Sequence, residues 1–537
     1  MTLQVFDAQF VARLSTAFAA QLPQYLPRQR WFGSKAKQIH SVQLSECIPM
    51  PLSDALALIA LARVEFIEGA GETYMLPLIA PTSHGALPPD SAVVRLPVLQ
   101  SPSELPLMDA LANQEFLTAI LDSVLKGESL PGNAGRLIAS REAALDRQIA
   151  ASADCLPPRL LKGEQSNTSI VYGDRLILKF FRRVEEGTNP DEEVGHFLTA
   201  RAQFANIPPL YGSLKYESPE SKVATLGILQ GYVPNHGDAW RFIVESLVEL
   251  FASLDHPTEQ LIPSSTQPSA TSRGNADGAS PELAKQLQLI ALLGKRTAEL
   301  HLALSSSSVD PDFAPEPFTP EFREGLDGVF HDLTVRNFDA LRSKLQALPE
   351  ALAELAKEAL ALEDDALLAL HTVLERDIRA FRTRIHGDYH LGQVLFTGSD
   401  FFIIDFEGEP ARPLNERRDK RSPLQDVAGM LRSFHYAAHS ASVAARERLA
   451  RSHQPDGQVD KLAAQWRALA SQEFLRSYRL AAGNARFLPS SSNEFDALLR
   501  VHVLEKAIYE LGYELNNRPS WVAIPLEGIR EILTISK

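Results

Sequence analysis

Acidic, amide and histidine side chains gather in one run between residues 384 and 410, RIHGDYHLGQVLFTGSDFFIIDFEGEP. Asp388 lies two residues after His386. Gln393 precedes the apolar run VLF, and Asp405 follows the apolar run FFII. A positioned carboxylate can remove a proton from a hydroxyl group, and oxygen ligands suit magnesium. We therefore expect Asp388 to act as a base in phosphoryl transfer, with Gln393 and Asp405 binding Mg²⁺ that neutralises phosphate charge.

The spacing within this run is that of protein kinases, which carry His-Arg-Asp, an Asn five residues later, and then Asp-Phe-Gly. Here the runs read His-Gly-Asp, Gln and Asp-Phe-Glu. The apolar runs VLF and FFII flank a Thr-Gly-Ser-Asp turn, which predicts a hairpin that brings both metal ligands to one point. A solvated loop and hairpin is the plainer interpretation of a lone His-x-Asp, and a zinc site at His386 and His390 is disfavoured because such histidines are more often structural.

A lysine inside an apolar run, Lys179 in RLILKFF, indicates a second functional set, because burying an unpaired charge is costly. Ten residues later Asn189 begins the run NPDEE, with the capping residue, proline and acids that are typical of a helix start. We expect Glu193 on that helix to pair with Lys179, as in the lysine–glutamate pair that orders phosphates in kinases. Glu192 is the rival partner, and a surface lysine with a solvated head is the plainer alternative.

Two further segments are candidates for contacts with ATP. The run GEQSNTS, residues 163–169, precedes the lysine strand, and its side chains and backbone amides are suitable donors to phosphate. The run GILQGYVPN falls where a hinge between two lobes is expected, and backbone groups there are expected to hold adenine. The candidates are Gln165, Ser166 and Thr168 in the first run and Gln230 and Val233 in the second.

A polar and aromatic stripe lies on the last long helix, expected over 493–516. Its members recur about one helical turn apart, so they share a face. Sugars are bound by fixed donors and acceptors beside a flat apolar surface, which makes this face a candidate for the acceptor sugar. Core packing is the plainer interpretation of such a stripe. The expected sugar contacts are Lys506, Tyr509, Tyr513 and Asn517, with His390 and Glu407 from the catalytic run.

Composition narrows the function classes. The chain has 537 residues, too many for one core, with 45% hydrophobic and 22% charged residues. A net charge of -14 disfavours nucleic acid as a partner. Neither a signal-peptide core at the N-terminus nor an apolar run long enough to span a bilayer is present, and the two cysteines have no ligand-like spacing. We expect a cytoplasmic protein with no membrane partner.

Periodicity divides the chain into differently patterned parts. Strand-like runs occur at 42–49, 56–66 and from Met75, and a helical period covers 106–125. Strands and turns alternate from about residue 156, and from Ala239 the chain is mostly helical.

The fold class expected from this order is α+β, a bilobal protein-kinase-like fold with an added domain. The N-terminal α/β cap domain and an intermediate segment cover 1–150, the β-rich N-lobe covers 151–235 and the α-rich C-lobe covers 236–537. Residues 256–281 are rich in Pro, Ser, Thr and Gly, and they are expected to form a flexible insertion.

Six segments resemble bacterial maltokinases, which make maltose 1-phosphate from maltose and ATP and are relatives of the aminoglycoside phosphotransferases. The resemblance covers most of the chain. The segments are RQRWFGSKAK (28–37), EQSNTSIVYGDRLILKFFRR (164–183), RTAELHLAL (296–304), HGDYHLGQVL (386–395), IDFEGEPARPLNERRDKRSPLQDVAGMLRS (404–433) and EKAIYELGYELNNRPSWVAIPL (505–526).

The resemblance implies ATP and Mg²⁺ as cofactors, maltose as the small-molecule substrate, and a place in α-glucan or trehalose-linked metabolism. It leaves an association with a trehalose synthase open. It also implies that Asp426 is a structural acid of the C-lobe, and a helix N-terminal acid is the plainer interpretation. The roles implied by position are base for Asp388, metal ligands for Gln393 and Asp405, and nucleotide pair for Lys179 and Glu193.

Two rival functions remain. A kinase for another sugar or aminosugar, such as glucosamine, would use the same catalytic residues and differ only in its acceptor pocket. A non-catalytic pseudokinase that serves as a binding module is the second alternative, and the intact Lys179, Asp388, Gln393 and Asp405 argue against it.

Overall fold

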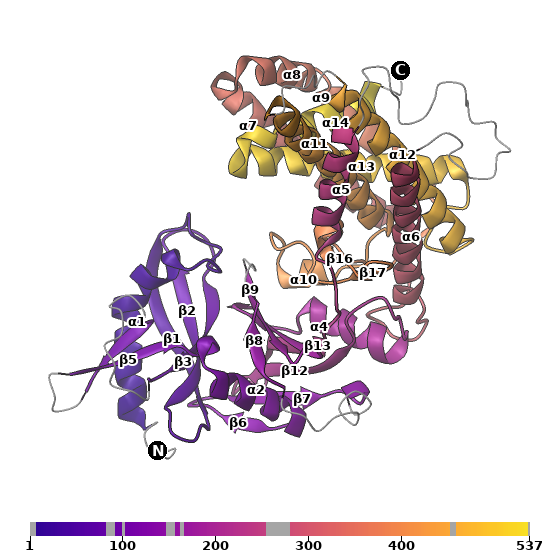
Figure 1. Ribbon diagram of the computed structural model, residues 1–537. Helices are drawn as coiled ribbons and strands as arrows, with labels where there is room; N and C mark the ends of the chain where they lie inside the picture. The colour runs from indigo at the N-terminus through magenta and orange to yellow at the C-terminus, as the bar shows by residue number, and fades with distance from the viewer. Residues whose placement is uncertain are drawn as a thin grey trace. The chain divides into compact units, whose positions relative to one another are not determined.

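The computed structural model describes residues 7–81, 92–98, 103–145, 156–161, 166–253, 280–451 and 458–534. The chain forms two compact units. Unit 1 comprises residues 1–201 and 208–234, and unit 2 comprises 202–207 and 235–537 (Figure 1). The insertion predicted at 256–281 lies outside the described residues, except for its last two positions. Over the part of the chain that the structure describes, no helix combines the length and apolarity needed to cross a membrane.

The first sheet of unit 1 is antiparallel and is covered by the helix α1 (Ala8–Tyr25), which packs against β1 and β4. Its strand order is β1-β2-β3-β5-β4, and the short β11 pairs with β3. Buried apolar residues on β1, β2 and α1 form its core. The strands are β1 (Ile39–Met50), β2 (Ala57–Phe66), β3 (Glu72–Ile79), β4 (Val94–Pro97), β5 (Glu104–Asp109) and β11 (Arg183–Val184).

The second sheet of unit 1 has the order β6-β7-β12-β13-β10-β9-β8. Helix α2 packs against β7 on this sheet, and α4 packs against β12. The elements are α2 (Gln114–Lys126), β6 (Ser129–Pro131), β7 (Arg136–Arg141), β8 (Pro158–Leu160), β9 (Asn167–Tyr172), β10 (Leu176–Phe181), α4 (Pro190–His196), β12 (Leu210–Glu217) and β13 (Val223–Gly231).

The two sheets exchange strands along the sequence. β6 and β7, from the segment that precedes residue 150, join the second sheet, whereas β11, which follows β10, joins the first. The helix predicted over 106–125 is correct only in its second half. Its first residues belong to β5, which pairs with β3 and β4, and Asn113 caps the helix that follows. Cross-strand pairing therefore overrides the helical period at this point.

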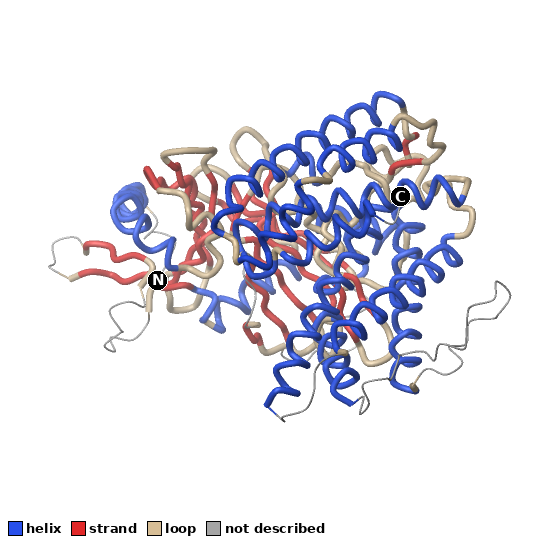
Figure 2. Tube along the Cα trace, turned by 90° about the horizontal axis from the view of Figure 1, so that it is seen from above, coloured by secondary structure: helices blue, strands red, loops and turns tan. Residues whose placement is uncertain are grey.

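Unit 2 is mostly helical, and Figure 2 draws helices in blue and strands in red. Helix α11 packs against α5, α12 and α13, and α6 packs along α12. The helices are α5 (Ala239–Ser253), α6 (Pro281–Leu304), α7 (Pro320–Lys344), α8 (Glu350–Leu360), α9 (Glu363–Leu374), α10 (Leu414–Arg417), α11 (Leu424–Arg451), α12 (Val459–Ala482), α13 (Ser492–Asn517) and α14 (Ala523–Thr534). Strand β14 (Glu316–Pro317) pairs with the distant β15 (Phe381–Arg382), and β16 (Val394–Phe396) forms a hairpin with β17 (Phe401–Ile403).

A buried carboxylate, that of Glu46 on β1, fastens the loop that joins β6 and β7. Its Oε1 accepts from the backbone amides of Cys47 and Asn133, each at 2.8 Å. Its Oε2 accepts from the amide of Gly135 at 2.6 Å and from the hydroxyl of Tyr216 at 2.9 Å. Glu46 is fully buried, so these donors take the place of water.

The substitution Glu46→Gln is expected to lower the stability of unit 1 by about 2–4 kcal/mol, because an amide nitrogen would then face backbone donors. Thermal unfolding and hydrogen exchange of the Asn133 and Gly135 amides would measure it. The exposed Glu65, paired with Arg63, gives the control Glu65→Gln, for which little change is expected. Equal melting temperatures for Glu46→Gln and the wild type would contradict this role.

Candidate active site

The loop that precedes β16 carries the predicted base, and a buried histidine shapes it. The Nε2 of His386 lies 2.9 Å from the carbonyl oxygen of Ile404, so this nitrogen donates. Its Nδ1 then accepts from the backbone amide of Asp388, at 3.4 Å. The ring packs between Tyr389 and Phe406, with centroids 5.3 and 4.9 Å away. His386 therefore positions the backbone of Asp388 and does not itself face a substrate.

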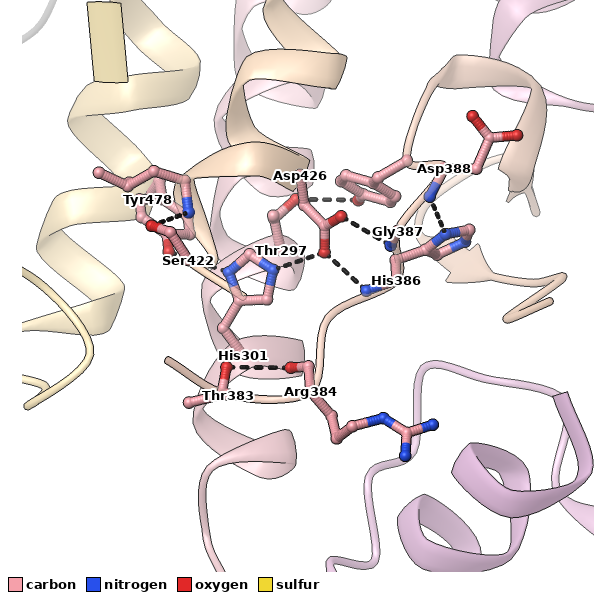
Figure 3. A network of polar contacts seen from close by, with 12 residues as sticks. Thr297, His301, Thr383, Arg384, His386, Gly387, Asp388, Ser422, Asp426 and Tyr478 are labelled. Atoms are coloured by element: carbon pink, nitrogen blue, oxygen red, sulfur yellow. Dashed lines mark hydrogen bonds and ion pairs between the residues drawn. The ribbon is translucent and has the colours of Figure 1, made fainter. Parts of the chain in front are cut away.

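A single carboxylate holds this loop to the helices behind it, as Figure 3 shows. Asp426, in the first turn of α11, accepts from the backbone amides of His386 at 2.8 Å and Gly387 at 2.9 Å. Its Oδ2 also lies 3.1 Å from the Nε2 of His301 on α6, whose Nδ1 is 2.9 Å from the hydroxyl of Tyr478 on α12. Asp426 is 2% exposed and His301 0%. The structural role implied for Asp426 is confirmed.

The environment of Asp426 keeps it ionised. Burial by itself raises the pKa of this carboxyl, but the hydrogen bond and charge of His301, with the amide of Gly387, outweigh it and lower the pKa below its ordinary value. Close packing supports the arrangement, since a Cβ atom on Gly429 would lie only 2.5 Å from the carbonyl oxygen of Tyr389. Glycine there lets α11 approach the loop.

The predicted metal ligands meet on the hairpin β16–β17. The side-chain Nε2 of Gln393 lies 2.8 Å from Oδ2 of Asp405, and the amide of Ile404 donates to the carbonyl of Gln393 at 3.0 Å. Asp405 has a φ of +68°, a left-handed conformation that aspartate adopts more readily than most residues. Carboxylate and amide oxygens on one rigid hairpin are hard ligands that fit magnesium.

The carboxylate of Asp388 is flanked by two nitrogen groups. The Nζ of Lys506 on α13 lies 3.9 Å from Oδ1, and Nε2 of His390 lies 3.9 Å from Oδ2. The Nδ1 of His390 accepts from the amide of Gly392, so the proton sits on Nε2. Burial lowers the pKa of His390, which is therefore neutral near pH 7. Among the described residues no hydrogen bond reaches the Asp388 carboxylate, which leaves it open to an acceptor hydroxyl.

A polar cavity opens beside Asp388, with Lys506, Glu409 and Arg412 in its lining. Burial alone would lower the pKa of Lys506, but the charges of Asp388 and Glu409 raise it overall, so the ammonium stays charged. Burial likewise opposes ionisation of Glu409, whereas Lys506, the hydroxyl of Tyr509 and Arg412 lower its pKa. Glu409 is therefore an acceptor near pH 7, and Arg412 holds its Oε2 at 3.1 Å.

The predicted sugar contacts separate into two groups. Lys506 and Tyr509 lie by the cavity carboxylates, and the ammonium is 4.8 Å from the ring centroid of Tyr509. Tyr513 is 46% exposed one turn further on, under Arg518, and Asn517 donates to the carbonyl of Tyr513 at 2.9 Å. Asn517 thus serves the end of its own helix.

Glu409, which the sequence analysis did not single out, lines the cavity beside Asp388. The chain turns at Gly408, which has a φ of +71°, and Gly408 and Glu409 both line the cavity. Glu407 contributes its backbone carbonyl to Arg417 at 3.3 Å and is not among the cavity's lining residues. A second glutamate so close to Asp405, the aspartate expected to bind Mg²⁺, was the signal in the sequence that could have identified Glu409.

In unit 1 the lysine of β10 meets a carboxylate of α4 that the sequence analysis did not single out. The Nζ of Lys179 lies 2.9 Å from Oδ2 of Asp191, whose side chain is 1% exposed. The first turn of α4 points Asp191 at the strand, and the pairing of Lys179 with Glu193 stays a prediction. Glu192, the rival, is held by Lys215 and by the hydroxyl of Thr225, each at 2.7 Å.

The other nucleotide candidates lie on or next to the second sheet. Thr168 and Ser169 are on β9, and Ser169 is opposite Lys179. Ser166 is exposed just before this strand. Gln230 lies inside β13, opposite Ile177 and Leu210 on the strands at either side, whereas Val233 follows the end of β13. Gln165 lies outside the described residues.

Two family models match the chain. Residues 25–111 match the maltokinase N-terminal cap domain, and residues 271–463 match the phosphotransferase enzyme family. The first match covers the region of the α1-covered sheet, and the second covers the loop of Asp388, the hairpin β16–β17 and all of α11. The expected combination of a cap domain with an aminoglycoside-phosphotransferase-like catalytic region is confirmed.

Two relatives of the chain are named glucosamine kinases. That of Streptacidiphilus jiangxiensis is 22% identical over 374 residues, covering 69% of this chain and 72% of the relative. That of Mycolicibacterium smegmatis is 24% identical over 378 residues, covering 69% and 78%. A solved glucosamine kinase in complex with glucosamine, ADP and inorganic phosphate aligns with a TM-score of 0.60 at 18% identity, over 97% of this chain and 99% of that one. The last comparison shows a shared fold.

Replacing Asp426 by Asn is expected to destabilise unit 2 by about 3 kcal/mol, since an amide nitrogen would face the donors of the catalytic loop. The folded pKa of Asp426 lies below that of the unfolded chain, about 3.9. Its contribution is therefore complete above that value and is lost as pH falls through the folded pKa. Urea unfolding between pH 7 and pH 3 should show that the difference in free energy of unfolding between wild type and variant narrows only at the acid end.

Asp332, exposed on α7, gives the matched control Asp332→Asn, for which no such gap is expected. If the difference in free energy of unfolding between wild type and Asp426→Asn stayed constant through the acid range, the charge of Asp426 would not contribute to stability.

Asp191→Asn is expected to weaken ATP binding on the order of tenfold, because it removes the charge that fixes the Lys179 ammonium. Glu193→Gln, a matched change two residues away, is expected to have a smaller effect. Calorimetric titration of each variant with ATP makes the comparison. A larger loss for Glu193→Gln would return the functional pairing to Glu193.

Proposed function

Because the chain combines a maltokinase-type cap domain with a catalytic region of the phosphotransferase enzyme family, we propose that it transfers the γ-phosphoryl group of ATP to maltose, giving maltose 1-phosphate. The observation that carries the proposal is the open carboxylate of Asp388 at a polar cavity, on a loop fixed from behind by Asp426. The proposed setting is α-glucan or trehalose-linked metabolism in the cytoplasm.

Each proposed role is taken from the residues of one unit by itself. Lys179, held by Asp191, would bind phosphate oxygens of ATP. Gln393 and Asp405 would hold Mg²⁺, which supplies charge neutralisation to the phosphates. The acceptor hydroxyl donates to Asp388, its proton passes to that carboxylate, and its oxygen forms the new bond to phosphorus as ADP leaves.

Recognition of the sugar is proposed to use the cavity beside Asp388. Glu409 accepts hydrogen bonds from sugar hydroxyls, and Lys506 donates to sugar oxygens. The ring of Tyr509 offers an apolar face, and the exposed Tyr513 lies one turn further along α13. Two aromatic residues in series suit a disaccharide better than a single ring.

Glucosamine is the second candidate substrate, and the glucosamine kinases among the relatives favour it. An aminosugar carries an ammonium group, for which an ionised Glu409 is an ion-pair partner. For both candidates Asp388 is the base. Glu409 would accept a hydrogen bond from a hydroxyl of maltose, whereas it would form an ion pair with the ammonium of glucosamine.

The substitution Asp388→Asn is expected to lower kcat by about 10²–10⁴ fold while ATP binding stays intact, because the amide cannot accept the proton. A coupled assay of ADP release measures kcat, and calorimetric titration with ATP measures nucleotide binding separately. A rate near that of the wild type would remove Asp388 as the base.

ADP release over maltose, glucosamine and glucose, with the product identified by phosphorus and carbon NMR, is expected to give maltose 1-phosphate as the main product. On maltose, Glu409→Gln should raise KM by only about tenfold, the loss of one charged hydrogen bond. Fast turnover of glucosamine with none of maltose, together with a much larger KM effect of Glu409→Gln on glucosamine, would replace maltose by the aminosugar.

A further inference from the structure

A buried arginine connects the two sheets of unit 1. Arg182 lies between β10 and β11 and is 3% exposed. From this position its guanidinium contacts residues of the cap sheet and a residue of β9. We propose that Arg182 is a positioning residue through which the cap domain sets the place of β9, and with it the affinity for ATP. The inference rests on the proposed function as a kinase.

The contacts on the cap side are of three kinds. The NH2 group of Arg182 donates to Oδ2 of Asp109, at the end of β5, at 2.7 Å. The guanidinium carbon lies 4.9 Å from the ring centroid of Trp31, a cation–π contact. The backbone carbonyl of Arg182 accepts from the amide of Met75 on β3 at 2.8 Å. Both the side chain and the backbone of Arg182 are therefore bound to the cap.

The contact on the other side is with the candidate nucleotide strand. The Nε of Arg182 donates to the hydroxyl oxygen of Thr168 at 3.0 Å. Thr168 is opposite Phe180 on β10, and the next residue, Ser169, is opposite Lys179. Because the hydroxyl accepts from the guanidinium, its own hydrogen is free to point to an acceptor such as a phosphate oxygen. Arg182 thereby orients the hydroxyl of Thr168, the residue next to Ser169, which pairs across the sheet with Lys179.

Only arginine meets these requirements at once. The planar guanidinium directs Nε to Thr168 and NH2 to Asp109 while its face lies on Trp31, whereas a lysine offers one ammonium and no plane. Trp31 belongs to the segment RQRWFGSKAK, and the proposed reaction assigns no other role to this segment. The contact with Trp31 gives that segment a role in the nucleotide site.

The test compares Arg182→Gln and Arg182→Lys with Arg183→Gln. Arg183 is the adjacent arginine, and its side chain is 47% exposed. Binding of a fluorescent ATP analogue is measured without sugar, and KM for ATP, KM for sugar and kcat are measured separately. Arg182→Gln is expected to weaken ATP binding and raise KM for ATP on the order of tenfold, with KM for sugar unchanged. Arg182→Lys should recover little, and Arg183→Gln should match the wild type.

Two more variants keep the test decisive if Arg182→Gln does not fold. Thr168→Val removes the receiving hydroxyl and should give the same rise in KM for ATP, and in the double variant the two effects should not add. Trp31→Leu changes only the cap side and should raise KM for ATP in the same direction.

Wild-type ATP affinity in Arg182→Gln, or unchanged ATP affinity in Trp31→Leu and Thr168→Val, would overturn the proposal. Equal rises in KM for ATP and sugar with a lowered melting temperature would show a purely structural role and also overturn it. Failure of the wild type to bind the ATP analogue would instead remove the proposed kinase function.

Discussion

The carboxylate of Asp426 is the constraint on which the catalytic loop depends. It binds two successive backbone amides of the loop and a histidine that a tyrosine holds in turn, so α6, α11 and α12 all fix one short segment. These bonds go to backbone amides, so they fix the loop without occupying the carboxylate of Asp388. A buried, fully hydrogen-bonded carboxylate is costly to disturb, which gives the loop its rigidity.

Charge balance governs the cavity beside that loop. Asp388 and Glu409 keep Lys506 charged, and Lys506 and Arg412 keep Glu409 ionised, so each group compensates for the burial of another. Such a wall presents both donors and acceptors, which matches the alternating needs of sugar hydroxyls better than an apolar pocket would. The same wall also suits an ammonium group, because Glu409 is ionised.

Unit 1 follows a similar rule with different residues. Lys179 is buried against Asp191, and Arg182 is buried against Asp109, so each cation inside the β structure has a carboxylate from another element. Strand β11 joins the cap sheet directly after β10 ends in the second sheet. The cap is therefore continuous with the lysine strand through a few residues, and its position bears directly on that strand.

The sequence by itself determined what depends on short-range order: the spacing of Asp388, Gln393 and Asp405, the hairpin between them, and the helix start at Asn189. Turn chemistry, capping and alternation act within a few residues, so they can be read from the chain. The tertiary structure decided which of several neighbouring acids is used. Lys179 meets Asp191, and Glu409 lines the cavity, because helix rotation and the turn at Gly408 select among neighbouring acids. Strand β5 likewise replaced the first part of a predicted helix because its partners β3 and β4 come from elsewhere in the chain.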